Sequence, residues 1–256
     1  MTTVVSAYYW IKSKFPVDTY VQWMRNFFSL KCNKVIFTDR KTFPVLQSIE
    51  GSHTAIYVIV EIANFVSAKP EYNDKWASMH EIDPYKSIHS TDLYKIWNNK
   101  VEFVKMAIDL NFFKSDYFVW CDIGSFRNSS RITEFKNFPV VSDLENILFL
   151  QLEPFTKEEL VSPTNFDSRF HLDQRGVSVK NRIGGGIIAG DKKSWRSFHT
   201  VFYDTFEKFM EKSLYAQEQQ IFAFCIINNP DLFKLVTVPN GYRYDPWFYL
   251  HDYFSN

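Results

Sequence analysis

Residues 116–124 constrain the fold more than any other part of the chain, because an apolar run there stops abruptly at an acid. The run Tyr117–Cys121 holds only aromatic, branched and small apolar residues, as is typical of a strand buried on both faces. It ends at Asp122, and burying an ionised carboxylate without a partner is costly. Ligands of open α/β sheets bind at the carboxyl ends of strands. We therefore predict that Asp122 lies at the centre of an active site; the alternative is an acid that caps the turn after a central strand.

Length and charge exclude several classes of protein. The chain has 256 residues, which is enough to build one α/β domain with a sizeable core. It carries 29 basic and 29 acidic residues, so it lacks the overall positive field that nonspecific nucleic-acid binding requires. No nucleic-acid partner is expected. The aromatic content of 18% with only 8 glycines indicates a globule packed with aromatic rings.

Cysteines and the amino-terminal residues bear on the compartment. Cys32, Cys121 and Cys225 are distant, odd in number and show no C-x-x-C spacing, so neither a disulfide framework nor a zinc site is expected. The chain starts without a basic and then apolar leader, and no apolar run is long enough to span a membrane. We expect a cytoplasmic protein without a transmembrane segment, with peripheral attachment to a membrane left open.

Apolar runs and helical periodicities alternate along the first half of the chain. Strands are expected at residues 4–9, 34–39, 54–62 and 116–121, and helices at residues 18–30 and 93–108. Asp18 is the expected N-cap of the first helix. This alternation predicts a Rossmann-like sheet within a single domain. The polar segment 69–90 is expected to form an excursion or lid over the sheet rather than part of the core.

The second half contains a run of three glycines between less regular segments. Strands are expected at residues 146–152 and 236–238, helices after Asp191 and at about residues 216–227, and a mobile loop within residues 153–180. Gly184, Gly185 and Gly186 match neither a dinucleotide-binding nor a Walker A pattern. They are interpreted either as a tight turn or bulge between strands, or as a place where the backbone approaches a ligand.

Several polar residues are candidates for chemistry. Asp122 could bind Mg²⁺ or Mn²⁺. A metal-binding D-x-D pattern would place a second acid at position 124, where this chain has Gly124. A second ligand must therefore come from elsewhere, or the site works without a metal. Glu218 stands in the first turn of a predicted helix, where it could cap the helix or act as a general base. Cys121 is interpreted as a buried apolar residue rather than a nucleophile.

Four further residues have both a binding and a structural interpretation. Asp39 ends the second predicted strand and could contact a ribose hydroxyl or cap the next turn. Lys95 and Lys100 could reach phosphates from the helix that precedes the key strand, or be solvated. His251 could be a metal ligand contributed late in the sequence, or a ring packed among the aromatic residues near the end of the chain.

Together these segments resemble a known family. The resemblance is carried by residues 4–9 (VVSAYY), 35–39 (VIFTD), 93–100 (LYKIWNNK), 117–124 (YFVWCDIG), 126–127 (FR) and 183–186 (IGGG). They are similar to the HtrL/YibB family, bacterial and viral proteins associated with surface-polysaccharide synthesis and similar to glycosyltransferases of the GT-A fold. The resemblance covers nearly the whole chain, and the block Trp120–Gly124 is its most specific part.

The resemblance implies a mixed sheet flanked by helices and a nucleotide-sugar-dependent glycosyltransferase. Residues 1–125 would form the nucleotide-binding half and residues 126–256 the acceptor-side half of one GT-A-like domain. Donor contacts are expected from Ala7, Tyr8, Asp39, Lys95, Lys100, Gly184, Gly185 and Gly186. Asp122 and His251 would hold Mn²⁺ or Mg²⁺, and Asp122 and Glu218 would be catalytic. The implied partners are a nucleotide diphosphate sugar and a glycan or lipid-linked acceptor.

Two other functions remain open from the sequence. Because Gly124 replaces the second acid, the chain could be a noncatalytic protein that binds a glycan or nucleotide and keeps the fold. A Rossmann methyltransferase that uses the glycine-rich segment is disfavoured, since the cofactor-binding glycines of that class follow the first strand, whereas these begin at residue 184.

Overall fold

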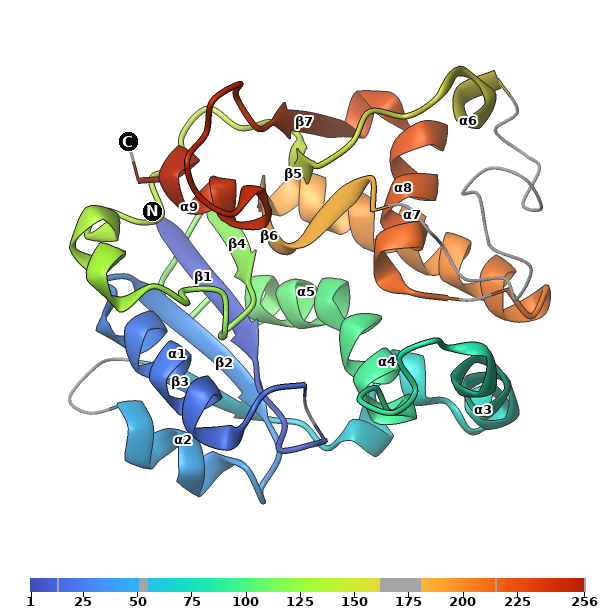
Figure 1. The fold of residues 1–256 in the computed structure, drawn as a ribbon, viewed down its shortest axis with the longest axis horizontal. Coiled ribbons are helices and arrows are strands. Elements are labelled where there is room, and N and C mark those ends of the chain that lie inside the picture. The colour runs from blue at the N-terminus through green and yellow to red at the C-terminus, as the bar shows by residue number, and fades with distance from the viewer. Residues whose placement is uncertain (13, 51–54, 162–180, 215, 256) are drawn as a thin grey trace.

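A single mixed sheet organises the protein (Figure 1). The computed structural model describes residues 1–12, 14–50, 55–161, 181–214 and 216–255. Within these ranges the strands are β1 (Thr2–Ala7), β2 (Asn33–Thr38), β3 (Ala55–Ile59), β4 (Tyr117–Cys121), β5 (Ile147–Gln151), β6 (Ile183–Asp191) and β7 (Phe233–Thr237). They pair in the order β3-β2-β1-β4-β6-β5-β7.

The order of the strands creates a crevice between β1 and β4. β1 pairs in parallel with β2 on one side and with β4 on the other, and β2 pairs in parallel with β3. The chain therefore builds the sheet outward in one direction as far as β3 and then crosses to the other side of β1. In open α/β sheets such a reversal leaves a ligand-binding crevice at the carboxyl ends of the two strands. Those ends are Ala7 and Cys121.

Helices cover both faces of the sheet. The α-helices are α1 (Val17–Ser29), α2 (Phe43–Glu50), α3 (Asn73–Ile82), α4 (Thr91–Trp97), α5 (Lys100–Leu110), α6 (Lys157–Val161), α7 (Lys192–Glu211), α8 (Glu218–Asn228) and α9 (Tyr249–Tyr253). The 3₁₀ helices are η1 (Ile62–Asn64), η2 (Val66–Ala68), η3 (Pro70–Tyr72), η4 (Ser129–Phe135), η5 (Pro230–Leu232) and η6 (Pro246–Phe248). α3, α4, α5, α7 and α8 pack into one apolar layer, and α1, α2, η4 and α9 into the other.

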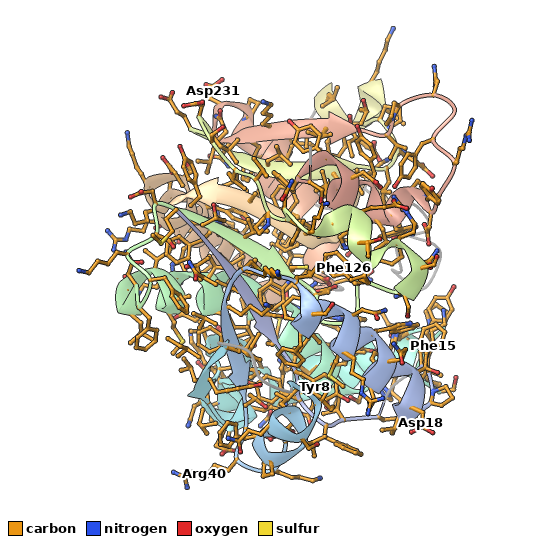
Figure 2. The ribbon with its side chains drawn as sticks, turned by 90° about the vertical axis from the view of Figure 1, so that its left-hand side faces the viewer. Tyr8, Phe15, Asp18, Arg40, Phe126 and Asp231 are labelled. Atoms are coloured by element: carbon orange, nitrogen blue, oxygen red, sulfur yellow. The ribbon has the colours of Figure 1, made fainter. Side chains whose placement is uncertain are left out.

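Alternate side chains of the central strands supply the two layers. Val4 and Val119 belong to the layer under α1, whereas their neighbours Val5 and Trp120 belong to the layer under α5 and α7. This is the period of two that a pleated strand imposes. Side chains fill the space on both sides of the sheet, as Figure 2 shows. Full burial of one such side chain contributes about 1.5–3 kcal/mol, so the two layers hold the sheet and helices together.

The predicted strands all overlap observed ones, and the predicted α/β sheet flanked by helices is confirmed. β6 is the strand that the sequence did not predict, because three consecutive glycines have low strand propensity. It runs antiparallel to both β4 and β5, and its register against β5 shifts between Phe149 and Leu150. The glycines thus lie in a strand with a bulge, not in a turn.

Two helix predictions need correction. α1 has Pro16 as its N-cap, and Asp18 lies inside the first turn instead of capping it. The single helix expected at 93–108 is two helices, α4 and α5, separated at Asn98 and Asn99. The Asn98 amide donates to the carbonyl oxygens of Tyr94 (2.9 Å) and Ala216 (2.8 Å), which ties the break to the segment before α8. As a result, a new helix begins at Lys100.

The predictions for two less regular regions, residues 69–90 and 153–180, are next compared with the structure. Residues 69–90 are not a lid over the sheet, because Tyr72, Trp76 and Met79 are buried in the apolar layer. Residues 162–180 of the expected mobile loop lie outside the described residues. Among the described helices, none has the length and apolarity needed to cross a membrane.

Candidate active site

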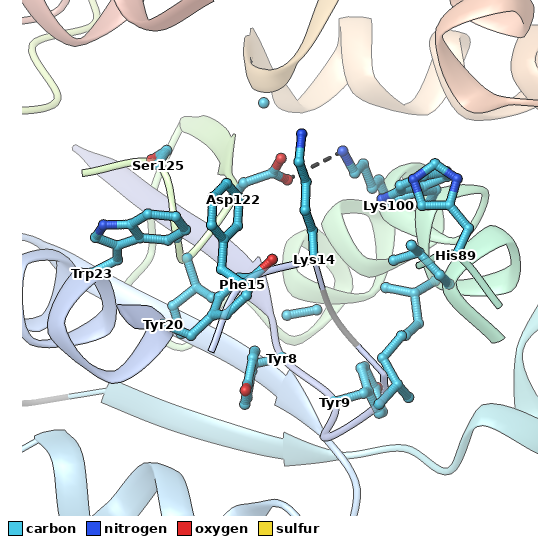
Figure 3. A pocket seen from close by; sticks show the side chains of 18 of the residues that line it. Tyr8, Tyr9, Lys14, Phe15, Tyr20, Trp23, His89, Lys100, Asp122 and Ser125 are labelled. Carbon is cyan, nitrogen blue, oxygen red and sulfur yellow. Dashed lines mark ion pairs between the residues drawn. The ribbon is translucent and has the colours of Figure 1, made fainter. Parts of the chain in front are cut away.

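A pocket of about 370 Å³ opens at the carboxyl ends of β1 and β4, where the strand order reverses (Figure 3). Five residues predicted from the sequence line it, namely Ala7, Tyr8, Lys100, Asp122 and Gly186. The pocket thus opens where the crevice rule predicts a ligand site, since Ala7 ends β1, Tyr8 follows it, and Asp122 follows β4.

A charge cluster forms the base of the pocket. The Lys100 Nζ lies 3.1 Å from Asp122 Oδ1 and 3.3 Å from Glu218 Oε1, and it donates to the Gly185 carbonyl oxygen at 3.0 Å. The side chains of Lys100 and Glu218 are 4% and 6% exposed, whereas Asp122 is 44% exposed. Three segments converge here, because Lys100 begins α5, Glu218 begins α8, and Asp122 follows β4. The cluster thus presents one carboxylate to the pocket and buries the other two groups behind it.

Burial and charge oppose each other within the cluster. Burial alone would lower the pKa of Lys100, but the carboxylates of Asp122 and Glu218 outweigh it and raise that pKa, so the ammonium stays charged. Burial raises the pKa of Glu218, against the opposing effect of Lys100. The second oxygen of Glu218, Oε2, is buried and has no hydrogen-bond partner among the described residues. Lys100 is therefore the group that stabilises Glu218 in this position.

The Asp122 side chain faces the pocket instead of capping its own turn. Its Oδ1 accepts a hydrogen bond from Trp120 Nε1 at 2.8 Å, and its backbone N–H donates to the Gly186 carbonyl at 2.8 Å. A Cβ at Gly186 would lie 3.5 Å from Asp122 Oδ2, so glycine keeps the space beside this oxygen open. A Cβ at Gly185 would lie 3.2 Å from Phe222 and 3.4 Å from Glu218 Oε1. The second glycine therefore lets α8 approach β6 closely.

Asp122 pairs with Lys100 at the place where the family resemblance implies a divalent cation. Mg²⁺ is commonly held by one or two carboxylates and completes its shell with water and substrate phosphates, and in the described part of the chain no group of three or more His, Cys, Asp or Glu could hold a metal ion. Oδ1 of Asp122 is already bonded to Lys100 and Trp120. A side chain at position 124 would meet Trp23 (3.4 Å) and Tyr20 (3.6 Å). The Lys100 ammonium thus supplies a positive charge beside Oδ1 of Asp122, whereas Oδ2 lies beside Gly186.

Aromatic rings form one wall of the pocket. Phe15, Tyr20 and Trp23 contact one another edge to face, with ring centroids 5.0–6.1 Å apart. The Arg127 guanidinium lies 4.5 Å from the centre of the Trp23 ring and 4.8 Å from that of Phe248. Figure 3 shows Phe15, Tyr20 and Trp23 on one side of Asp122, with Lys100 and His89 on the other. The wall combines flat apolar surfaces with a fixed positive charge.

Asp39 and Lys95 have structural roles away from the pocket. Asp39 Oδ1 accepts a hydrogen bond from the Thr42 N–H at 2.6 Å, so this acid caps the turn before α2. Lys95 pairs with Asp92 within α4 at 3.1 Å. Neither side chain lines the pocket. For Asp39 the structure favours the capping interpretation over donor binding, and Lys95, whose side chain is 16% exposed, is held by Asp92 within its own helix.

His251 is a residue of α9, and its ring packs among the aromatic side chains beneath this helix. Its Nε2 lies 3.1 Å from Ser125 Oγ, and its ring stacks on Phe126 with centroids 3.9 Å apart. Burial disfavours the imidazolium and lowers its pKa to about 3. His251 does not line the pocket, so the structure favours the packed interpretation over a metal ligand shared with Asp122. Cys121 is likewise buried, and burial raises its pKa, as expected of an apolar residue.

The whole chain matches one protein family. The family described as "Bacterial protein of unknown function (HtrL_YibB)" matches residues 2–255. The chain belongs to this family. Protein HtrL of Escherichia coli K12 is a relative, 21% identical over 267 residues that cover 95% of this chain and 90% of that protein. The family resemblance read from the sequence is therefore confirmed.

Solved structures similar to this HtrL_YibB protein include two transferases. Mouse xyloside xylosyltransferase 1, in its apo form, gives a TM-score of 0.46 at 10% identity, covering 92% of this chain and 85% of the mouse chain. A glycosyltransferase involved in the glycosylation of the major capsid of PBCV-1 gives 0.42 at 10% identity, covering 92% and 81%.

Sequence reasoning missed the aromatic wall and one side of the pocket. Tyr20 and Trp23 were interpreted only as the buried face of a helix, because aromatic residues at helical spacing are usually core. Arg127 appeared only within the family resemblance, and His89 only as part of the presumed lid. The one local signal was the density of aromatic residues around the end of β1, and core packing explains such density equally well.

Proposed function

We propose that this HtrL_YibB protein binds a nucleoside diphosphate sugar in the pocket and transfers the sugar to a hydroxyl of a glycan or lipid-linked acceptor, without a divalent cation. One observation carries the proposal. The half-exposed Asp122 carboxylate, with Lys100 behind it, lies beside an aromatic wall at the point where the strand order reverses.

Each part of the ligand has a counterpart in the pocket. Tyr20 and Trp23 offer faces and edges against which a nucleobase can pack, and base–aromatic stacking contributes about 1–3 kcal/mol. Arg127, Lys12 and Lys14 line the same pocket and carry the positive charges that a diphosphate needs. The planar guanidinium of Arg127 is held in place by the rings on which it stacks.

The proposed reaction makes mainly electrostatic demands on the protein. The bond between the anomeric carbon and the diphosphate breaks, and the leaving group takes the electron pair. Fixed positive charges stabilise the negative charge that develops on the diphosphate. Asp122 accepts hydrogen bonds from sugar hydroxyls and, at 44% exposure, can reach them. No step in this account passes through a metal ion.

A thermal-shift screen of UDP- and GDP-sugars tests the proposal, and it is to be run in EDTA and again with added Mn²⁺. One donor class is expected to raise the melting temperature in EDTA, with a stabilisation of about 2.7 kcal/mol at a hundred times its Kd, and Mn²⁺ should add nothing. Binding that appears only with Mn²⁺ would overturn the metal-free proposal. No binding under either condition would overturn the proposed function, and binding without turnover would identify a noncatalytic nucleotide-binding protein.

Replacing Tyr20 with alanine is expected to weaken donor binding by about 5- to 150-fold, because part of the aromatic wall is lost. Calorimetric titration of the donor found in the screen measures the change. Phe112→Ala is the matched control, since this ring is 49% exposed and does not line the pocket. Equal affinities of the two variants for the donor would show that the nucleobase does not bind against the aromatic wall.

A further inference from the structure

A second buried carboxylate lies behind the side of the pocket that faces the aromatic wall. The side chain of Asp83, which follows α3, is 1% exposed. Its Oδ2 accepts hydrogen bonds from Tyr94 Oη (2.5 Å) and from His89 Nδ1 (2.8 Å), and its Oδ1 accepts one from the Tyr85 N–H (2.7 Å). Burial alone would raise the pKa of Asp83, but these hydrogen bonds outweigh burial and lower it. Asp83 is therefore a fixed anion at neutral pH.

His89 connects this anion to the pocket. Because Nδ1 donates to Asp83, the neutral imidazole presents Nε2 as an acceptor, and no described residue bonds to that nitrogen. The ring is held edge-on against Trp97, with centroids 5.1 Å apart and planes at 84°. His89 lines the same pocket as Lys100 and Asp122, and its side chain is 18% exposed (Figure 3). The pair thus has the arrangement of a base oriented by a carboxylate.

Glu218, the base expected from the sequence, is less suited to take a proton from a substrate. Its side chain does not line the pocket, and its Oε1 is bonded to the buried Lys100. A general base must come within hydrogen-bond reach of the proton that it removes. Glu218 is separated from the pocket, whereas His89 forms part of its wall.

We propose that His89 is the general base for the acceptor hydroxyl and that Asp83 is its positioning residue. The proposal rests on the proposed function. The acceptor oxygen forms a bond to the anomeric carbon while the bond from that carbon to the diphosphate breaks, with its electron pair leaving on the diphosphate. The hydroxyl proton moves to His89 Nε2, and the resulting imidazolium is stabilised by Asp83 through Nδ1–H. Direct displacement of this kind inverts the anomeric configuration.

Titratable and charged groups face His89 from both sides. Asp83, His80, Tyr85 and Tyr94 surround the ring on the side of α3 and α4, and His80 Nε2 lies 3.1 Å from the His89 carbonyl oxygen. Across the pocket the charged groups are Lys12, Lys14, Lys100, Asp122 and Arg127. A general base can take the hydroxyl proton only while its accepting nitrogen carries none. Turnover is therefore expected to fall as the pH is lowered.

Variants of the pair test the proposal with a measured rate, the release of UDP or GDP from the nucleotide sugar found in the screen. His89→Gln is expected to lower turnover about 10²- to 10⁴-fold and to remove the acid limb of the pH–rate profile, while the donor KM changes less than about threefold. Asp83→Asn should lower turnover at least about tenfold, because Nδ1–H loses its anionic partner. Unchanged turnover and an unchanged pH profile in His89→Gln would overturn the proposal.

His199→Gln is the matched control, because His199 also pairs with a carboxylate, Glu102, at 2.5 Å, and does not line the pocket. Its turnover should equal that of the parent protein. Equal losses in His199→Gln and His89→Gln would mean that both histidines act only on folding, which would overturn the proposal.

A chemical readout separates this proposal from the proposed function. Diethyl pyrocarbonate, followed by peptide mass spectrometry, should modify His89 at Nε2, more slowly when the nucleotide sugar is bound and more slowly in Asp83→Asn. If His89 does not react at a diethyl pyrocarbonate concentration that modifies free imidazole, the proposal that His89 is the general base is overturned, even if the protein binds and cleaves the donor. Failure of every nucleotide sugar to bind would instead overturn the proposed function.

Discussion

Replacing Lys100 with methionine is expected to lower the free energy of unfolding by about 3–5 kcal/mol, the usual cost of removing one partner from a buried ion pair. Methionine keeps most of the side-chain volume but leaves Glu218, which is 6% exposed, without a cation. Asp122 is 44% exposed, so water can solvate it and most of the loss should come from Glu218. Urea unfolding of the parent and the variant at pH 7 measures the difference.

The double variant Lys100→Met with Glu218→Gln provides the internal check. Glutamine carries no charge to be stranded, so the double variant should recover part of the stability lost in Lys100→Met, and the deviation from additivity measures the coupling. Lys105→Met is the matched control on the same helix, since Lys105 is 39% exposed and pairs with Asp109 at 2.9 Å. It should cost less than about 1 kcal/mol. If Lys100→Met costs no more than Lys105→Met, the charge cluster does not stabilise the site.

Acid is expected to destabilise the protein through His251, even though this residue is remote from the pocket. Its pKa is lowered to about 3 in the folded state, against about 6.5 in the unfolded chain. The unfolded state therefore binds the proton more tightly, so the contribution of His251 is constant above about pH 6.5 and is lost progressively as the pH falls toward 3. Between pH 7 and pH 4.5 the loss should reach about 2.5 kcal/mol.

Urea unfolding at the two pH values tests this expectation with His251→Phe, which keeps a ring between Phe126 and Phe248. The stability difference between pH 7 and pH 4.5 should be about 2.5 kcal/mol smaller in this variant than in the parent protein. His80→Gln, at a partly exposed position, should behave like the parent. An unchanged difference in His251→Phe would show that the buried imidazole is not responsible for the acid sensitivity.

The sequence alone determined the described strands other than β6, most helices and the edge of the sheet at which the pocket opens. Apolar runs identify β1, β2 and β4 because burial on both faces favours apolar residues in the middle of a strand, although a few polar residues such as Ser6 and Thr38 are buried there as well. The acid that follows the run at Cys121 lines the pocket, as the same logic predicts, since a carboxylate there needs a function or a partner. These signals are local. Each depends on residues a few positions away, so it can be read without knowing how the rest of the chain packs.

Tertiary structure decided which residues meet. The bond from Lys100 to Glu218 spans 118 positions in the sequence, and it depends on a helix break at Asn98 and Asn99 that periodicity does not reveal. Local sequence also does not reveal the strand order or the position of the glycines of β6. This strand lies between β4 and β5 because it pairs with both, and they are distant in the sequence. His89 and Asp122 are far apart in the sequence and line one pocket together with residues of α4, α5 and β4. Periodicity records which face of an element is buried, whereas the partner of that face is selected by packing over the whole chain.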